Sequence, residues 1–113
     1  MELLRFDVPR RMGKTHWAVA VMMRNPDVVM VAATHNMADL VANKYPWVKN
    51  RVHYASAEYF NSLKIDCKVV ILDEVEYAKN GHIMPAFMHN PELMVIELRT
   101  SEETEKALMK LIQ

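Results

Sequence analysis

Glycine, cysteine and long apolar stretches are all scarce in this sequence. Its two glycines are Gly13 and Gly81, so a Gly/Ser-rich linker is excluded. The single cysteine, Cys67, has no partner for an intramolecular disulfide or a cysteine zinc site, which is typical of a reducing compartment. No apolar run approaches the roughly 20 residues that span a bilayer, and the N-terminus lacks the features of a signal peptide. We therefore expect an unexported cytoplasmic protein with no membrane partner.

Neither sign of charge dominates the chain. Fourteen basic residues balance fourteen acidic ones, so no global field favours polyanions, and any contact with nucleic acid must be local. The 113 residues, of which 51% are hydrophobic, are enough for one core and too few for two. We expect a single domain over residues 1–113.

Short apolar runs alternate with segments of helical periodicity. The predicted strands are Leu3–Val8, Val28–Ala33, Val52–Ala55, Lys68–Leu72 and Leu93–Leu98. The predicted helices begin near Thr15, after a cap at Thr34 or Asn36, at Ser56 and at Ser101, with a mixed segment over Val75–His89. This alternation predicts an α/β fold of three α/β/α layers with a mainly parallel sheet of about five strands. Ligands of such sheets bind beyond the carboxyl ends of the strands.

A phosphate-binding motif follows the first predicted strand. Val8 to Thr15 fit the P-loop pattern GxxxxGK[ST], except that its first glycine is missing. Gly13 lets the backbone approach phosphates, Lys14 reaches the β and γ oxygens, and Thr15 ligates Mg²⁺. The residues that we assign to cofactor binding are Arg11, Met12, Gly13, Lys14, Thr15 and His16. The alternative is a basic first turn on a surface helix, with His16 solvated.

An acidic pair, Asp73-Glu74, follows the fourth predicted strand. A carboxylate at this point holds the Mg²⁺ shell, while the next one orients or deprotonates the attacking water. The alternative is an acidic pair that starts a helix in a solvated loop. Taken with the P-loop, the pair predicts a site for ATP and Mg²⁺, with Thr15 and Asp73 as metal ligands and Glu74 as the catalytic base.

Both motifs carry a family resemblance. Arg10-Arg11-Met12-Gly13-Lys14-Thr15 and Val69-Val70-Ile71-Leu72-Asp73-Glu74 resemble the Walker A and Walker B motifs of phage terminase large subunits, and more loosely those of superfamily 2 helicases. The resemblance implies a minimal RecA-like P-loop NTPase core and a Mg²⁺-dependent ATPase. It also implies a role in DNA packaging, in the host cytoplasm. In the family an arginine at the position of Arg10 contacts the phosphates in cis, which would make Arg10 catalytic beside Lys14 and Glu74. Solvated loop charges are the alternative for Arg10 and Arg11.

Other segments match the family less specifically. Val28–Thr34 is similar to its second strand, whose following loop faces nucleic acid, and Thr100 and Ser101 match a polar motif that senses the γ-phosphate. For Thr100 and Ser101 we favour ordinary strand-end and helix-capping chemistry. No adenine-recognition segment precedes the first strand and no nuclease domain follows, so a complete packaging motor is not expected. The family further implies DNA or RNA as a partner, and a homo-oligomer or a larger motor complex.

Basic and aromatic residues also cluster outside the P-loop. The cluster comprises Lys44, Tyr45, Trp47, Lys49 and Arg51. Such interleaving suits single-stranded nucleic acid, but we favour a helix-to-strand linker with a buried tryptophan. The five histidines form no metal-binding spacing, and Cys67 is expected to be a buried, inert thiol.

Two functions are compatible with these motifs. The first is a P-loop protein that binds and hydrolyses ATP and acts with nucleic acid. The second is a nucleotide-binding regulatory or interaction module without efficient turnover. A small nucleoside kinase is disfavoured because no arginine-rich lid segment follows the acidic pair.

Overall fold

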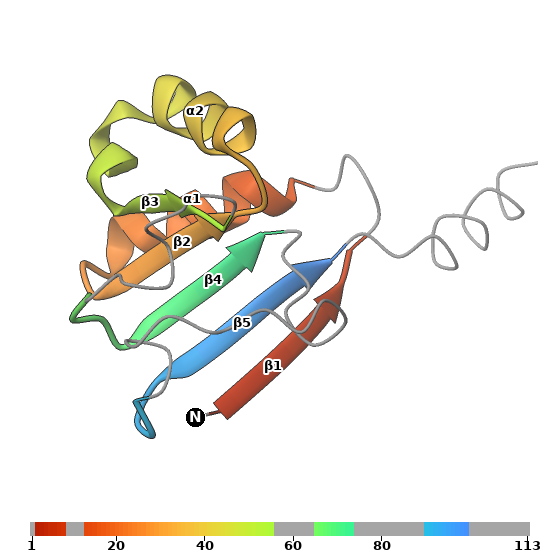
Figure 1. The fold of residues 1–113 in the computed structure, drawn as a ribbon, viewed down its shortest axis with the longest axis vertical. Helices are drawn as coiled ribbons and strands as arrows, with labels where there is room; N and C mark the ends of the chain where they lie inside the picture. Colours follow the sequence, from red (N-terminus) through yellow and green to blue (C-terminus); the bar gives the residue numbers. More distant parts are fainter. Residues whose placement is uncertain (1, 9–12, 56–64, 74–89, 100–113) are drawn as a thin grey trace, which may run out of the picture.

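The computed structural model of this chain describes residues 2–8, 13–55, 65–73 and 90–99 (Figure 1). The elements are β1 (Glu2–Asp7), α1 (Lys14–Arg24), β2 (Val28–Ala32), α2 (His35–Lys44), the 3-10 helix η1 (Pro46–Arg51), β3 (Val52–Tyr54), β4 (Val69–Asp73) and β5 (Met94–Arg99). The five strands form one sheet in the order β1-β5-β4-β2-β3, and every pairing is parallel. The predicted three-layer α/β fold class is confirmed.

The last strand of the sequence lies inside the sheet, between β1 and β4. Along β5, Arg99 pairs with Asp7 of β1, and Leu98 pairs with Asp73 of β4. The carboxyl ends of the three strands are therefore level at one edge of the sheet. Because parallel strands all point the same way, the segments that follow β1 and β4 leave from this same edge.

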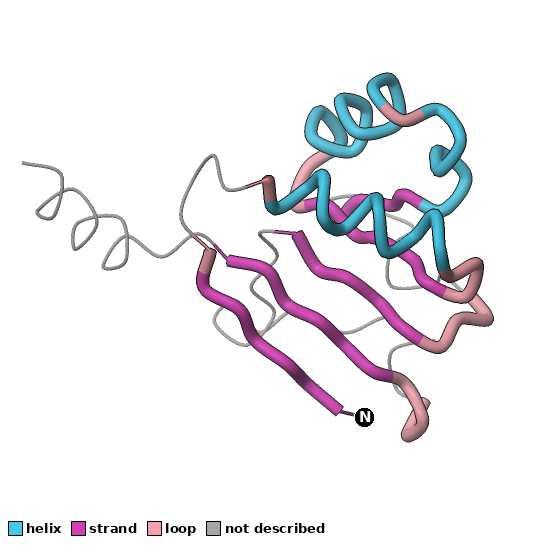
Figure 2. Tube along the Cα trace, turned by 180° about the vertical axis from the view of Figure 1, so that it is seen from behind, coloured by secondary structure: helices cyan, strands magenta, loops and turns pink. Residues whose placement is uncertain are grey.

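Both faces of the central strands are buried. Met30 of β2 and Ile71 of β4 pack on one face against the buried side of α1, which lies over β2 in Figure 2. The alternate residues point to the opposite face, where the buried cluster comprises Val29, Val31, Cys67, Val70, Leu72, Leu93 and Val95. Burial on two sides explains why these strands read as continuous apolar runs.

The helix α1 begins one residue earlier than predicted, directly after Gly13. Gly13 has φ 74° and ψ 27°, in the left-handed region that favours glycine, and its carbonyl oxygen accepts a 2.8 Å hydrogen bond from the Trp17 amide. The buried residues of α1 are Ala18, Val19 and Met22. The spacing of apolar residues after Thr15 predicts Trp17 on the apolar face of this helix, but its side chain is 45% exposed.

Thr34 caps the helix α2, since its hydroxyl accepts a 3.2 Å hydrogen bond from the Met37 amide. The alternative cap, Asn36, is wrong. Helical periodicity predicts Leu40 and Val41 on the apolar face of α2, but Leu40 is exposed and the buried residues are Ala38 and Val41. The pair Tyr45-Pro46 predicts the end of this helix, and α2 does end at Lys44. Pro46 also opens η1, which was not predicted.

Three predicted segments lie outside the described residues: the helix from Ser56, the mixed segment Val75–His89 and the helix from Ser101. Over the ranges given above, no helix is long and apolar enough to cross a bilayer.

Candidate functional site

Lys14 and Thr15 meet Asp73 at the carboxyl edge of the sheet. Lys14 Nζ lies 2.8 Å from Asp73 Oδ1. The Thr15 hydroxyl donates a 3.1 Å hydrogen bond to Asp73 Oδ2, across 58 residues of sequence. The structure therefore brings Lys14 and Thr15 of the first motif into contact with Asp73 of the second.

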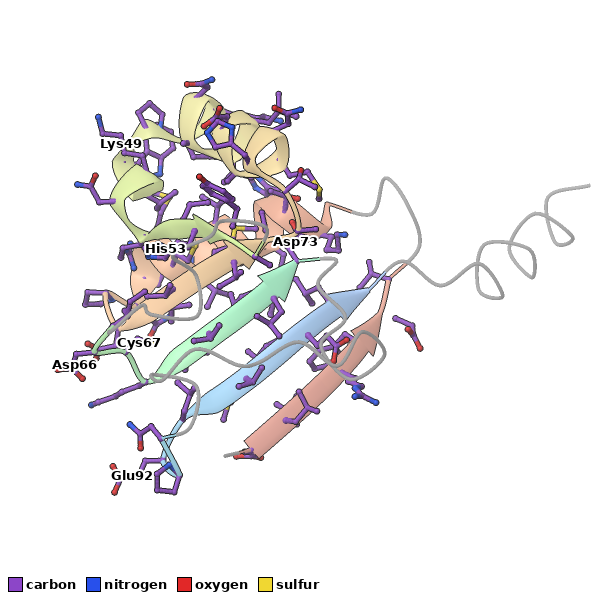
Figure 3. All side chains as sticks on the ribbon, viewed as in Figure 1. Lys49, His53, Asp66, Cys67, Asp73 and Glu92 are labelled. Carbon is purple, nitrogen blue, oxygen red and sulfur yellow. The ribbon has the colours of Figure 1, made fainter. Side chains whose placement is uncertain are left out.

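The fold explains this convergence. Asp73 is the last residue of β4, as Figure 3 shows, and it lies on the α1 side of the sheet because it is two residues beyond Ile71. Lys14 and Thr15 are the first two residues of α1, whose start Gly13 fixes through its positive φ. The end of β4 and the start of α1 thus supply the three residues Lys14, Thr15 and Asp73, which form the triad of this site.

Asp73 is a buried carboxylate with an unusual environment. Its side chain is 3% exposed and that of Lys14 is 15% exposed. Burying a charge is costly unless it is paired, and here an ammonium and a hydroxyl supply the pairing. Asp73 Oδ1 accepts no aligned hydrogen bond in the described part of the chain, so its described partner is the charge of Lys14. Such an oxygen is well suited to act as a ligand for a cation.

The donor set fits Mg²⁺. This ion prefers oxygen ligands and is usually held in phosphate sites by one or two carboxylates together with phosphates and water. The Thr15 hydroxyl and the Asp73 carboxylate are oxygen ligands already within 3.1 Å of each other. Among residues 2–8, 13–55, 65–73 and 90–99, no group of three or more His, Cys, Asp or Glu side chains forms a metal site. The donors therefore fit a shared metal–phosphate site better than a protein-only metal site.

The start of α1 adds a second attraction for anions. The first amide groups of a helix have no partner within the helix, and the helix dipole is positive at this end. Within the described part of the chain no side chain caps α1, and the first turn of α1 contains no acidic residue. The same helix end carries Lys14, so backbone and side chain both favour an anion here.

Several predicted site residues fall outside the described ranges. They are Arg10, Arg11, Met12, Glu74, Thr100 and Ser101, and their roles stay predictions. His16 is exposed on α1, and its Nδ1 lies 3.3 Å from the hydroxyl of Tyr45. Its assignment to cofactor binding also stays a prediction.

The basic and aromatic cluster lies at the connection between α2 and β3, as the linker interpretation predicted, but the buried tryptophan expected there is not found. Trp47 is 61% exposed, so the buried-tryptophan interpretation is wrong, and the buried aromatic residue is Tyr45. Arg51 donates hydrogen bonds to the carbonyl oxygens of Met22, Asn25 and Val28, at 2.8, 3.1 and 3.0 Å. Arg51 therefore joins η1 to the end of α1 and the start of β2, and is not a solvated cation.

Two titratable groups with shifted pKa values, the buried Cys67 and the half-buried His53, lie away from the site. Burial raises the pKa of Cys67 to about 11, with Asp66 and Asp27 adding to the effect, as expected of an inert thiol. Burial also lowers the pKa of His53 in β3 from its ordinary value of 6.5. Figure 3 labels both residues at a distance from Asp73 along the sheet.

A cavity of about 340 Å³ lies next to the triad, and sequence reasoning missed it. Its described lining residues are Phe6, Val8, Lys14, Trp17 and Leu98. Phe6 and Trp17 had been interpreted only as apolar positions of a strand and a helix. No sequence signal marks such a cavity, because its walls come from three elements that only the fold brings together.

No family model, curated protein or solved structure matches this chain.

Proposed function

We propose that this chain binds a nucleoside triphosphate, ATP, together with Mg²⁺. The observation that carries the proposal is the contact of Lys14 and Thr15, at the start of α1, with the buried Asp73 at the end of β4. P-loop proteins hold phosphates and Mg²⁺ with four parts: a helix that starts directly after a glycine, a lysine, a hydroxyl group and a carboxylate at the end of a strand. Their convergence on one point supports the proposal more strongly than either motif alone.

Each residue has a distinct task in this site. When phosphates bind at the start of α1, Lys14 pairs with their negative charge in place of Asp73. Asp73 and Thr15 would hold the Mg²⁺ through their oxygen atoms. Bound Mg²⁺ supplies neutralisation of the charge on the phosphate oxygens. Without a ligand, the Lys14–Asp73 pair keeps the buried carboxylate charge-compensated.

Hydrolysis of ATP is the second part of the proposal and rests on the resemblance to terminase and helicase ATPases. Glu74 deprotonates or orients the attacking water, and Arg10 stabilises the charge that develops on the transferred phosphoryl group. Nucleic acid as a partner, assembly into a motor complex and a cytoplasmic location have the same basis. With Arg51 engaged by backbone carbonyls, the cluster around Trp47 gives nucleic acid fewer cations than its composition suggested.

Calorimetric titration with ATP and Mg²⁺ tests the binding proposal. Wild type should bind, and Lys14→Ala should lose most of the affinity. Lys68→Ala removes a lysine that is 84% exposed outside the site, and it should bind as wild type does. Absence of binding to wild type would refute the proposal.

Turnover separates the enzyme from the binding module. We expect wild type to hydrolyse ATP, alone or with DNA, and Glu74→Gln to bind ATP but hydrolyse it far more slowly. Equal turnover by wild type and Glu74→Gln under every condition would leave a nucleotide-binding module without catalysis.

A further inference from the structure

We propose that the cavity beside Lys14 binds the nucleobase of the nucleotide, with Trp17 and Phe6 as its aromatic walls. This inference rests on the proposed function, because it assigns the base of the same ligand whose phosphates Lys14 binds.

Three elements build the cavity. Phe6 of β1 pairs in register with Leu98 of β5, so the two side chains lie side by side on the α1 face of the sheet. Val8 continues this face two residues beyond Phe6. Trp17 follows Lys14 by three residues on α1, which places both on one side of the helix. Phe6 and Leu98 therefore line the cavity from the sheet, and Trp17 lines it from α1.

The chemistry of the lining suits an aromatic ring. Phe6 is 47% exposed and Trp17 is 45% exposed, whereas the central strands β2 and β4 bury nearly all of their apolar side chains. Bases stack on aromatic side chains regardless of base identity. The volume of about 340 Å³ falls in the size range of small-molecule sites.

Continuity with the phosphate site selects the occupant. Lys14 lines the cavity and also contacts Asp73, so one side chain belongs to both places. A nucleoside triphosphate carries an apolar, stackable ring at one end and an anion that Lys14 attracts at the other. A second copy of this chain would cover the aromatic walls but would give no reason for the cavity to adjoin the triad.

The test compares ATP with inorganic triphosphate, each with Mg²⁺ and without nucleic acid. Wild type should bind ATP about tenfold or more tightly than triphosphate, since stacking on an aromatic side chain accounts for a difference of this size. Trp17→Ala should weaken ATP binding by about the same factor and leave triphosphate binding unchanged. Trp17→Phe should recover most of the loss. The matched control Trp47→Ala, which removes an exposed tryptophan outside the cavity, should bind both ligands as wild type does.

Fluorescence gives a second readout. In a Trp47→Phe background Trp17 is the sole tryptophan, so ATP should quench the emission and triphosphate should not. The inference is overturned if Trp17→Ala keeps the wild-type preference for ATP, or if Trp17→Ala changes only the oligomeric state. In either case triphosphate binding that depends on Lys14 would leave the proposed phosphate site standing. If wild type binds neither ATP nor triphosphate, the proposed phosphate site is overturned as well.

Discussion

Lys14 and Asp73 form an ion pair of 2.8 Å between the start of α1 and the end of β4, and both side chains are largely buried. Each charge compensates the other, and a buried charge that loses its partner is costly. The pair therefore contributes to stability as well as to the proposed chemistry, and the two contributions can be separated by mutation.

Lys14→Met should destabilise the protein by about 2 kcal/mol, because the Asp73 carboxylate stays buried without its cation while part of the site admits water. The double variant Lys14→Met, Asp73→Asn should recover much of this loss without recovering ATP binding. Urea unfolding monitored by circular dichroism measures both. Lys68→Met is the control for losing a surface lysine, and an equal stability of Lys14→Met and Lys68→Met would contradict the role of the pair.

Gly13→Ala should cost about 1 kcal/mol, because alanine is strained at a positive φ. An added Cβ would meet no atom of the described residues within 4 Å, so the expected cost is one of backbone conformation. Gly13→Asn should cost less, because asparagine tolerates the left-handed region. The urea midpoints of the two variants test this order, and an alanine variant more stable than the asparagine variant would contradict it.

Arg51→Ala should destabilise the protein by about 2 kcal/mol, since charge-assisted hydrogen bonds to three carbonyl oxygens are lost. Arg51→Lys should recover less than half of this, because an ammonium cannot reproduce the planar fork. Thermal unfolding is the measurement, with Lys49→Ala as the control for an exposed cation of η1. If Arg51→Lys were as stable as wild type, the hydrogen bonds of the guanidinium to the three carbonyl oxygens would not have the proposed stabilising role.

Stability should fall on acidification through His53. Burial lowers its pKa in the folded state from 6.5, so the unfolded chain binds the proton first. The contribution of neutral His53 is fully present above the unfolded pKa and is lost as the pH falls toward the lower folded value. His53→Gln should show a smaller loss of stability than wild type between about pH 7 and about pH 5.5. Parallel pH profiles for the two proteins would contradict this.

The continuous apolar runs made the central strands predictable. Strands such as β2 and β4 are buried on both faces. Such a strand is apolar at nearly every position, and this run can be recognised without knowing which strands lie beside it. The exposure of every residue of β1 was not predictable in the same way, since an edge position follows from strand order, which local sequence does not encode. For the same reason the insertion of β5 between β1 and β4 could not be predicted.

The site was predictable to the level of its motifs. Placing Lys14, Thr15 and Asp73 at one edge of the sheet required only parallel strands and the two motifs. Their direct contacts, and the cavity between Phe6 and Trp17, depend on the tilt of α1 over the sheet. The 3-10 helix η1 escaped prediction because buried Val48 and the hydrogen bonds of Arg51 determine it, and these are tertiary contacts.

The most direct measurement is the Mg²⁺ dependence of ATP affinity, by calorimetry, in wild type, Thr15→Val and Asp73→Asn. Wild type should bind ATP more tightly with Mg²⁺ than without it, and both variants should lose this enhancement because each lacks one proposed metal ligand. Without Mg²⁺, Asp73→Asn should bind ATP at least as tightly as wild type, since Lys14 no longer has to leave a buried carboxylate. Absence of ATP binding by wild type, or an undiminished Mg²⁺ enhancement in Asp73→Asn, would contradict the proposed site.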